Sequence, residues 1–137
     1  MKKRALVRAA VGSALAVTAS LAVLPSSAQA VHQCRTNQIC LYKDYDLQGS
    51  VLVISTLGTH NFTSNWVFYD QTRVNDKVSS IVNRSQWNVL ACDNFDCQGD
   101  SPKAVVGPGE RMNFKGSPGE LKNDRMSAIQ VTLRAGR

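Results

Sequence analysis

The sequence predicts an all-β fold, a sandwich built from two copies of one supersecondary unit. Short apolar runs are separated by the turn-favouring residues Gly, Asn, Asp and Pro. Residues 129–133 alternate apolar and polar side chains, which is the period-two pattern of a half-buried strand. A third observation is an internal repeat at an offset of about 50 residues. We therefore expect two duplicated halves whose sheets pack face to face.

Residues 1–30 have the features of a secretory signal peptide. Four basic residues lie within the first eight positions, and an uncharged apolar run follows over residues 9–24. The pattern Ala28-Gln29-Ala30 then fits cleavage after Ala30. A membrane span is the alternative, but the run is short for crossing a bilayer. We expect a secreted protein whose single domain covers residues 31–137.

The charge of the mature chain argues against nucleic-acid and membrane partners. The whole chain carries 16 cations and 10 acids, a net charge of +6. Four of the cations and none of the acids fall within residues 1–30, so 12 cations and 10 acids remain, a net charge of +2. No cluster of Lys and Arg is left in the mature chain to bind a polyanion.

Four cysteines, Cys34, Cys40, Cys92 and Cys97, are expected to form two disulfides because the chain is secreted. Three pairings are possible. The spacing favours the two local ones, Cys34–Cys40 and Cys92–Cys97. Closing loops this short contributes roughly 2 kcal/mol each, so these disulfides are expected to hold a loop in shape more than to hold the fold together. Zinc binding is the alternative, although neither spacing is C-x-x-C.

The strands are predicted in the same order in each half. Each half begins with an apolar run, continues through a turn that ends in Gln-Gly, and returns along a second apolar run. The turn 42–49 aligns with 92–99 at an offset of 50. The expected strands of these two hairpins are Ile39–Tyr42 with Val51–Ile54, and Val89–Cys92 with Ala104–Val106.

A second repeated element, Asn-Asp-x-x-Ser, precedes the last strand of each half. It occurs as Asn75-Asp76-Lys77-Val78-Ser79 and, 48 residues later, as Asn123-Asp124-Arg125-Met126-Ser127. Asn and Asp favour a turn, and the Ser hydroxyl can fold back over that turn. The oxygens of such a turn suit calcium, which takes six to eight hard ligands. One element supplies too few, but two elements related by a pseudo-twofold axis can lend oxygens to both sites.

The spacing from the hairpin aromatic to Gly and then to Asn-Asp-x-x-Ser resembles the βγ-crystallin Greek-key motif in its calcium-binding microbial form. The resemblance covers residues 38–133 and implies one Greek key over about 38–85 and a second over about 87–134. The C-x5-C and C-x4-C patterns further resemble the family of secreted Streptomyces metalloproteinase inhibitors. That family has the same fold of two Greek keys.

The resemblance implies about two calcium ions held between the paired motifs. With one carboxylate per motif, the affinity should fall in the range of roughly 10⁻⁵ to 10⁻³ M. The second motif departs from the pattern at Ala128, where the family has Ser. The metal-site residues expected are Asn75, Asp76, Lys77, Ser79, Asn123, Asp124, Arg125 and Ser127, with the carbonyls of Lys43 and Asp93.

The loop between Cys92 and Cys97 is the candidate inhibitory site. Its two cysteines occupy the positions of Tyr42 and Leu47, so a disulfide replaces a stacked pair and stiffens the tip. A stiff loop with one large apolar side chain suits a substrate-mimicking inhibitor, because its entropy is already lost. The residues of this loop are Cys92, Asp93, Asn94, Phe95, Asp96 and Cys97.

The resemblance places the family's reactive bond at Cys92–Asp93. A thermolysin-like enzyme favours a bulky apolar residue just after the cut bond, whereas Asp93 places a carboxylate there. Burying an unpaired charge costs several kcal/mol, which argues against a thermolysin-like target. The aromatic residues within 61–69 are expected to form a hydrophobic cluster, and a second binding surface is the alternative.

The sequence shows no nucleophile-base-acid set, so we do not expect an enzyme. The function expected is that of a secreted, metalloproteinase-inhibitor-like peptidase inhibitor, a monomer whose partner is a secreted protease of unspecified class. Two alternatives remain open. One is a non-inhibitory extracellular calcium-binding module, and the other is a killer-toxin-like antimicrobial protein.

Overall fold

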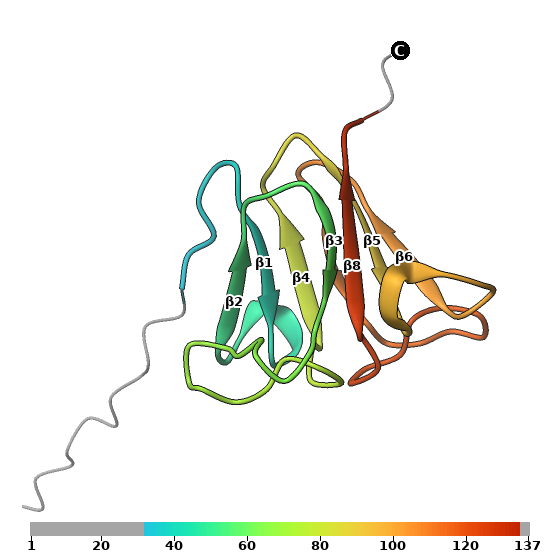
Figure 1. The fold of residues 1–137 in the computed structure, drawn as a ribbon. Helices are drawn as coiled ribbons and strands as arrows, with labels where there is room; N and C mark the ends of the chain where they lie inside the picture. Colours follow the sequence, from blue (N-terminus) through green and yellow to red (C-terminus); the bar gives the residue numbers. More distant parts are fainter. Residues whose placement is uncertain (1–31, 135–137) are drawn as a thin grey trace, which may run out of the picture.

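The computed structural model describes residues 32–134, which form two four-stranded antiparallel sheets packed face to face (Figure 1). The expected signal peptide lies outside the described residues. No helix within the described part of the chain is long and apolar enough to span a membrane. The elements are β1 (Ile39–Tyr42), η1 (Tyr45–Leu47), β2 (Val51–Ile54), β3 (Gly58–Asn61), β4 (Ser80–Asn83), β5 (Asn88–Cys92), η2 (Phe95–Cys97), β6 (Lys103–Val106), β7 (Arg111–Asn113) and β8 (Ala128–Thr132).

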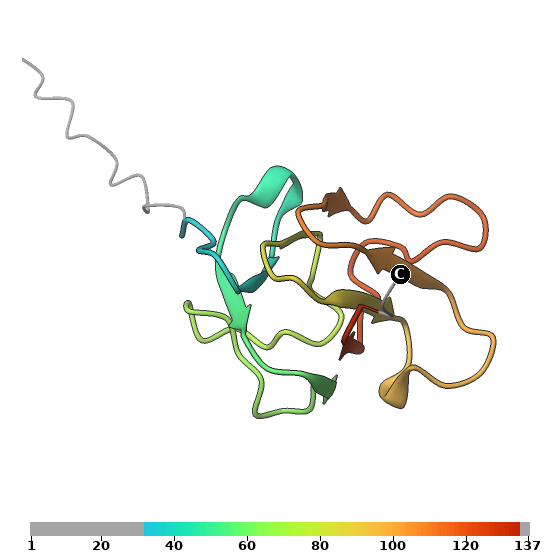
Figure 2. The same ribbon diagram turned by 90° about the horizontal axis from the view of Figure 1, so that it is seen from above.

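The two halves exchange their third strands. The first sheet has the order β2-β1-β4-β7 and the second has the order β3-β8-β5-β6. Strand β3, from the first half, therefore pairs with β8, and β7, from the second half, pairs with β4. Seen from above, the blue-green first half and the orange-red second half lie side by side (Figure 2). This topology confirms the predicted all-β sandwich of two Greek keys.

The core lies between the sheets and is filled mainly by inward-facing residues of β1, β2, β4, β5, β6 and β8 and by residues of the loops. In β8, Ile129 and Val131 are buried while Gln130 and Thr132 are more exposed, as the alternation predicts. Of the aromatic residues within 61–69, Phe62 and Phe68 are buried in this core and Trp66 packs against it, whereas Tyr69 is 64% exposed and lies outside the expected cluster. The buried core residues are Ile39, Leu41, Ile54, Phe62, Phe68, Val74, Val78, Ile81, Val89, Ala91, Val106, Phe114, Leu121, Met126, Ile129 and Val131.

The outer face of the first sheet is covered by the N-terminal segment, residues 32–38. Cys40 and Tyr42 face outward from β1, yet both are buried. The disulfide Cys34–Cys40 ties the segment to the sheet, and the hydroxyl of Tyr42 donates a hydrogen bond to the carbonyl of His32 at 2.7 Å. Both disulfides have the local pairing that the spacing favours.

Asn83, at the end of β4, joins the two Greek keys. Its side chain is fully buried, and its Nδ2 donates to the carbonyls of Trp87 at 2.7 Å and Val106 at 3.0 Å. Its Oδ1 accepts from the backbone N–H of Ser85 at 3.0 Å and from the Ser85 hydroxyl at 2.6 Å. The link between the halves is therefore held by a buried amide whose four hydrogen bonds are all made.

Replacing Asn83 with Ala is expected to destabilise the fold by about 2–3 kcal/mol, because it leaves buried carbonyls without donors. The melting temperature should fall by roughly 10–20 °C. Thermal unfolding followed by circular dichroism measures the change. The control is Asn65→Ala, since Asn65 is exposed. Equal melting temperatures for the two variants would contradict this role of Asn83.

Candidate functional site

The two hairpin tips share an unusual backbone conformation. Asp46 and Leu47 in η1 have φ values of 57° and 60°, and Asp96 and Cys97 in η2 have φ values of 57° and 55°. Left-handed residues other than glycine cost of order 1–3 kcal/mol each and persist only where neighbouring contacts hold them. Since both hairpins contain this pair, the conformation belongs to the fold and is not specific to either tip.

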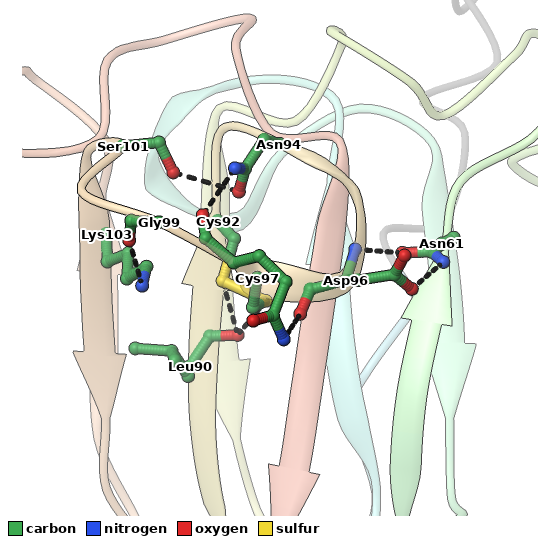
Figure 3. Close-up of a disulfide and its surroundings, with 10 residues drawn as sticks. Asn61, Leu90, Cys92, Asn94, Asp96, Cys97, Gly99, Ser101 and Lys103 are labelled. Atoms are coloured by element: carbon green, nitrogen blue, oxygen red, sulfur yellow. Dashed lines mark hydrogen bonds between the residues drawn. A yellow bond between two sulfur atoms is a disulfide. The ribbon is translucent and has the colours of Figure 1, made fainter.

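The hairpins differ in how they are closed. In the first, Leu47 packs against Tyr42, while in the second the equivalent residues form the disulfide Cys92–Cys97 (Figure 3). The hydroxyl of Ser80 also bridges the first hairpin, because it donates to the Asp44 carbonyl at 2.6 Å and accepts from the Leu47 N–H at 3.0 Å.

Ala128 occupies the place of Ser80 in the second hairpin. It is fully buried and packs with Cys92 and Cys97. The departure from the motif at Ala128 thus has a structural reason: the disulfide closes this hairpin in place of a hydroxyl.

An asparagine from the opposite half holds each tip. The Nδ2 of Asn61 donates to the Asp96 carboxylate at 2.6 Å, and the Asp96 N–H donates to the Asn61 Oδ1 at 2.7 Å (Figure 3). Asn113 makes the same two bonds to Asp46, at 2.7 Å and 2.9 Å. Sequence analysis missed both residues. The available signal was the dipeptide Asn-Phe at 61–62 and 113–114, whose Asn is the last residue of the third strand in each half.

The second hairpin exposes its tip and buries its base. Phe95 is 49% exposed and Asp96 is exposed, whereas Cys92 is fully buried. The Cys92–Asp93 peptide bond lies in this base. The Cys92 carbonyl accepts from the Ser127 N–H at 2.9 Å, and the Asp93 N–H donates to the Pro102 carbonyl at 3.2 Å.

The carboxylate of Asp93 forms a two-bond ion pair with Arg125. Nε and one terminal nitrogen of Arg125 lie 3.2 Å and 3.1 Å from the two carboxylate oxygens. The hydrogen bond to Asp93 raises the pKa of Arg125, with a weaker contribution from Asp76. The Asp93 side chain is only 17% exposed, so it lies against the protein surface beside its partner.

The equivalent position in the first half has the opposite charge. There Lys43 lies 3.2 Å from the carboxylate of Asp70. A hydrogen bond from the Thr72 hydroxyl, with smaller contributions from the Thr72 N–H and Lys43, lowers the pKa of Asp70 to about 2. The two hairpin bases are therefore electrostatically distinct although their backbones match.

The two Asn-Asp elements face one another across the pseudo-twofold axis. The N–H of Asp76 donates to the Met126 carbonyl at 3.1 Å, and the N–H of Asp124 donates to the Val78 carbonyl at 3.4 Å. Asp76 and Asp124 both adopt left-handed conformations, with φ values of 55° and 54°. Val78 and Met126 are fully buried and anchor the turns, which explains why each element stands at the entrance of a strand.

Several of the expected ligand oxygens lie close together. The Ser79 hydroxyl donates to the Lys43 carbonyl at 2.5 Å. The Ser127 hydroxyl lies 3.4 Å from a carboxylate oxygen of Asp76, which comes from the other motif. The basic side chains of Lys77 and Arg125 are exposed in the turns between these groups. Of the two hydroxyl contacts, the one between Ser127 and Asp76 joins the two motifs, and the one between Ser79 and Lys43 lies within the first half.

Two further oxygens occupy equivalent positions. The Oδ1 atoms of Asn75 and Asn123 are buried and have no hydrogen-bond partner. Residues 32–134 contain no group of three or more His, Cys, Asp or Glu side chains that could hold a metal. The oxygens present suit a hard cation such as calcium, which accepts carbonyls and hydroxyls, better than zinc.

Comparison with solved structures identifies a βγ-crystallin fold. A protein studied for the evolution of the eye lens βγ-crystallin domain fold matches with a TM-score of 0.58 and 17% identity, over 77% of this chain and 95% of that chain. A βγ-crystallin domain from Flavobacterium johnsoniae matches with a TM-score of 0.52 and 20% identity, over 72% and 98% of the two chains. A βγ-crystallin from Ciona intestinalis matches with a TM-score of 0.51 and 22% identity, over 69% and 99%. We found no match among curated protein sequences.

A family model gives the more specific result. The model of peptidase inhibitor family I36 matches residues 27–103, more than half of the chain. The matched range includes the first Greek key and the hairpin closed by Cys92 and Cys97. The family consists of inhibitors of peptidases and not of enzymes. The chain belongs to peptidase inhibitor family I36.

Proposed function

We propose that the chain inhibits a secreted peptidase through the hairpin of residues 92–97, with Phe95 as the side chain that enters the cleft of the enzyme. Membership in an inhibitor family gives the class of partner, a peptidase. The observation that supports this hairpin as the contact is its closed base and exposed tip, where Phe95 is 49% exposed. An apolar anchor on a stiff loop is the arrangement that binds a cleft with little loss of entropy.

The stiffness of the hairpin has sources beyond the disulfide. The amide of Asn94 donates to the Gln98 carbonyl and accepts from the Ser101 hydroxyl at 2.8 Å, so it bridges the two arms of the hairpin (Figure 3). Ordering a free backbone costs roughly 1–2 kcal/mol per residue. Because this ordering is already present in the free protein, binding to a peptidase does not incur it again.

The Cys92–Asp93 bond is proposed to resist hydrolysis in the complex. Hydrogen bonds to Ser127 and Pro102 hold both sides of the bond, and the disulfide joins the residues that flank the tip. The ion pair with Arg125 also holds the Asp93 carboxylate against the surface of the inhibitor, so that it does not extend toward the peptidase. We therefore propose a target that is not thermolysin-like and whose cleft is filled by Phe95.

An exposed aromatic at this position is not by itself a sign of inhibition. Tyr45 occupies the same place in the first hairpin and is 41% exposed. Its hydroxyl lies 3.5 Å from the Phe114 carbonyl. The disulfide, and the different charge at the hairpin base, distinguish the second hairpin from the first. Tyr45 is therefore a matched control for Phe95 within the same molecule.

We also propose that the paired Asn-Asp elements bind calcium. Support comes from the reciprocal contacts of Asp76 and Asp124, and from the unpartnered oxygens of Asn75 and Asn123. A bound calcium ion would give the buried Oδ1 atoms of Asn75 and Asn123 a partner, which they lack among the described residues. The second candidate function is that of a non-inhibitory extracellular calcium-binding module. It would apply if the protein inhibits no peptidase, because calcium binding by the Asn-Asp elements does not depend on inhibition by the 92–97 hairpin.

Two disulfides in a small peptidase inhibitor indicate an extracellular protein. We propose that the mature chain is a monomer that begins at Val31, after cleavage following Ala30. The intact mass of the secreted protein checks the cleavage site, and a mass that includes residues before Val31 would contradict it.

Replacing Phe95 with Ala is expected to raise the inhibition constant by at least about 30-fold, the equivalent of ~2 kcal/mol. The reason is that the aromatic side chain proposed to become buried in the cleft of the peptidase is lost. The wild type is first titrated against metallo-, serine and cysteine peptidases, and the variant against each enzyme inhibited. Tyr45→Ala should keep the wild-type constant. Inhibition that survives Phe95→Ala but not Tyr45→Ala would assign the contact to the first hairpin and contradict the proposal.

Removing calcium with EGTA is expected to lower the melting temperature. Each site saturated at one hundred times its Kd contributes about 2.7 kcal/mol by mass action. Asp76→Asn should reduce the calcium-dependent shift, since Asn tolerates the left-handed conformation but lacks the charge. Asp100→Asn, a change in an exposed residue, is the control. A melting temperature insensitive to EGTA, with no binding heat in calorimetry, would exclude the calcium site.

A further inference from the structure

We infer that Asn61 is a positioning residue of the inhibitory hairpin, and that it acts through Asp96 on the direction in which Phe95 is presented. The inference rests on the proposed function. Asn61 is the last residue of β3, so it belongs to the first Greek key, while the hairpin belongs to the second. The peptidase-binding tip is therefore held by a residue 35 positions away in the sequence.

The two hydrogen bonds of Asn61 act on different parts of Asp96. One holds the carboxylate at 2.6 Å, and the other holds the backbone N–H at 2.7 Å. That N–H belongs to the peptide bond that joins Phe95 to Asp96. Fixing this peptide plane restricts the backbone immediately after Phe95, and so the direction of the aromatic side chain.

The disulfide alone does not provide this restraint. It joins the ends of the loop at Cys92 and Cys97, five positions apart, but makes no direct contact with the peptide bond that joins Phe95 to Asp96. Asp96 has a φ of 57°, a left-handed conformation that Asp adopts more readily than most residues other than glycine, and its side chain is bound there by Asn61. The two contacts of Asn61, one hydrogen bond to the Asp96 carboxylate and one from the Asp96 backbone N–H, hold this conformation at an exposed site. Asn61 thus complements the disulfide.

The edge of the sheet gives Asn61 a fixed position. Strand β3 pairs with β8 along its whole length, and Asn61 lies opposite Ala128. Ala128 in turn packs against Cys92 and Cys97. The backbone that carries Asn61 and the disulfide that closes the hairpin are therefore both anchored on the same residue of β8.

The first hairpin offers an internal control of the same chemistry. Asn113 makes the equivalent two bonds to Asp46, with distances within 0.2 Å of those at Asn61. A purely structural role predicts the same consequences for loss of either asparagine. A positioning role predicts that only Asn61 affects inhibition, because only its hairpin contacts the peptidase.

The experiment compares Asn61→Ala with Asn113→Ala in the mature secreted protein. We expect similar decreases in melting temperature. Asn61→Ala should also raise the dissociation rate and the inhibition constant by about tenfold, and speed cleavage of the hairpin by the target, as a looser loop binds less well. Asn113→Ala should leave both constants at the wild-type value. Equal changes in the inhibition constant, or none with Asn61→Ala while the wild type inhibits, would overturn the inference.

Amide hydrogen exchange provides a readout that does not depend on any peptidase. The N–H of Asp96 should exchange faster in Asn61→Ala, and that of Asp46 in Asn113→Ala, each without an effect on the other. Unchanged exchange at Asp96 would overturn the inference. A wild type that inhibits nothing, with the expected exchange, would contradict the proposed function but leave the positioning of the tip by Asn61 supported.

A second variant covers the case in which Asn61→Ala does not fold. Asp96→Gly removes the carboxylate that Asn61 holds, while glycine adopts the left-handed conformation without strain. It should raise the inhibition constant, but by less than Asn61→Ala, because the backbone N–H of residue 96 can still donate to the Asn61 Oδ1. An inhibition constant that Asp96→Gly leaves unchanged, while the wild type inhibits, would overturn the inference.

Discussion

The exchange of third strands between the halves is the constraint on which the rest of the structure depends. Because β3 pairs with β8 and β7 pairs with β4, neither half can form its sheet alone. The exchange also brings each asparagine at the end of a third strand to the hairpin of the other half. The two Asn-Asp turns also contact one another reciprocally, because the backbone N–H groups of Asp76 and Asp124 each donate to a carbonyl of the opposite motif.

Features found in only one of the two halves are the candidates for a role in function, whereas features found in both belong to the fold. Left-handed hairpin residues and asparagine contacts occur in both halves and so belong to the fold. The disulfide at Cys92–Cys97, the small residue Ala128 beneath it, and the ion pair of Asp93 occur only in the second. These changes all concern one hairpin. The first hairpin therefore serves as a reference for the second, and the second hairpin, which differs from it, is the candidate for binding a peptidase.

Much of the fold could be predicted from the sequence, because the hairpins and Asn-Asp turns are local patterns that repeat. The local disulfides follow from short spacing. The exchange of β3 and β7 could not be predicted, because these strands are short and lack a clear apolar alternation. The contacts Asn61–Asp96 and Asp93–Arg125 join residues 35 and 32 positions apart. The exchange of β3 brings the first pair together, and the pairing of β5 with β8 brings the second pair together. The Asn-Phe dipeptide at the end of each third strand could have marked Asn61 and Asn113, but it does not indicate that they bind Asp96 and Asp46.

The central claim is that the disulfide-closed tip, and no other surface, occupies the cleft of the peptidase. The most direct measurement is a crystal structure of the inhibitor bound to the peptidase that it inhibits. The account predicts that Phe95 is enclosed in the cleft, with the contacts of Asn61 to Asp96 unchanged from the free protein. A complex in which Phe95 faces solvent, while η1 or the 61–69 segment fills the cleft, would contradict it.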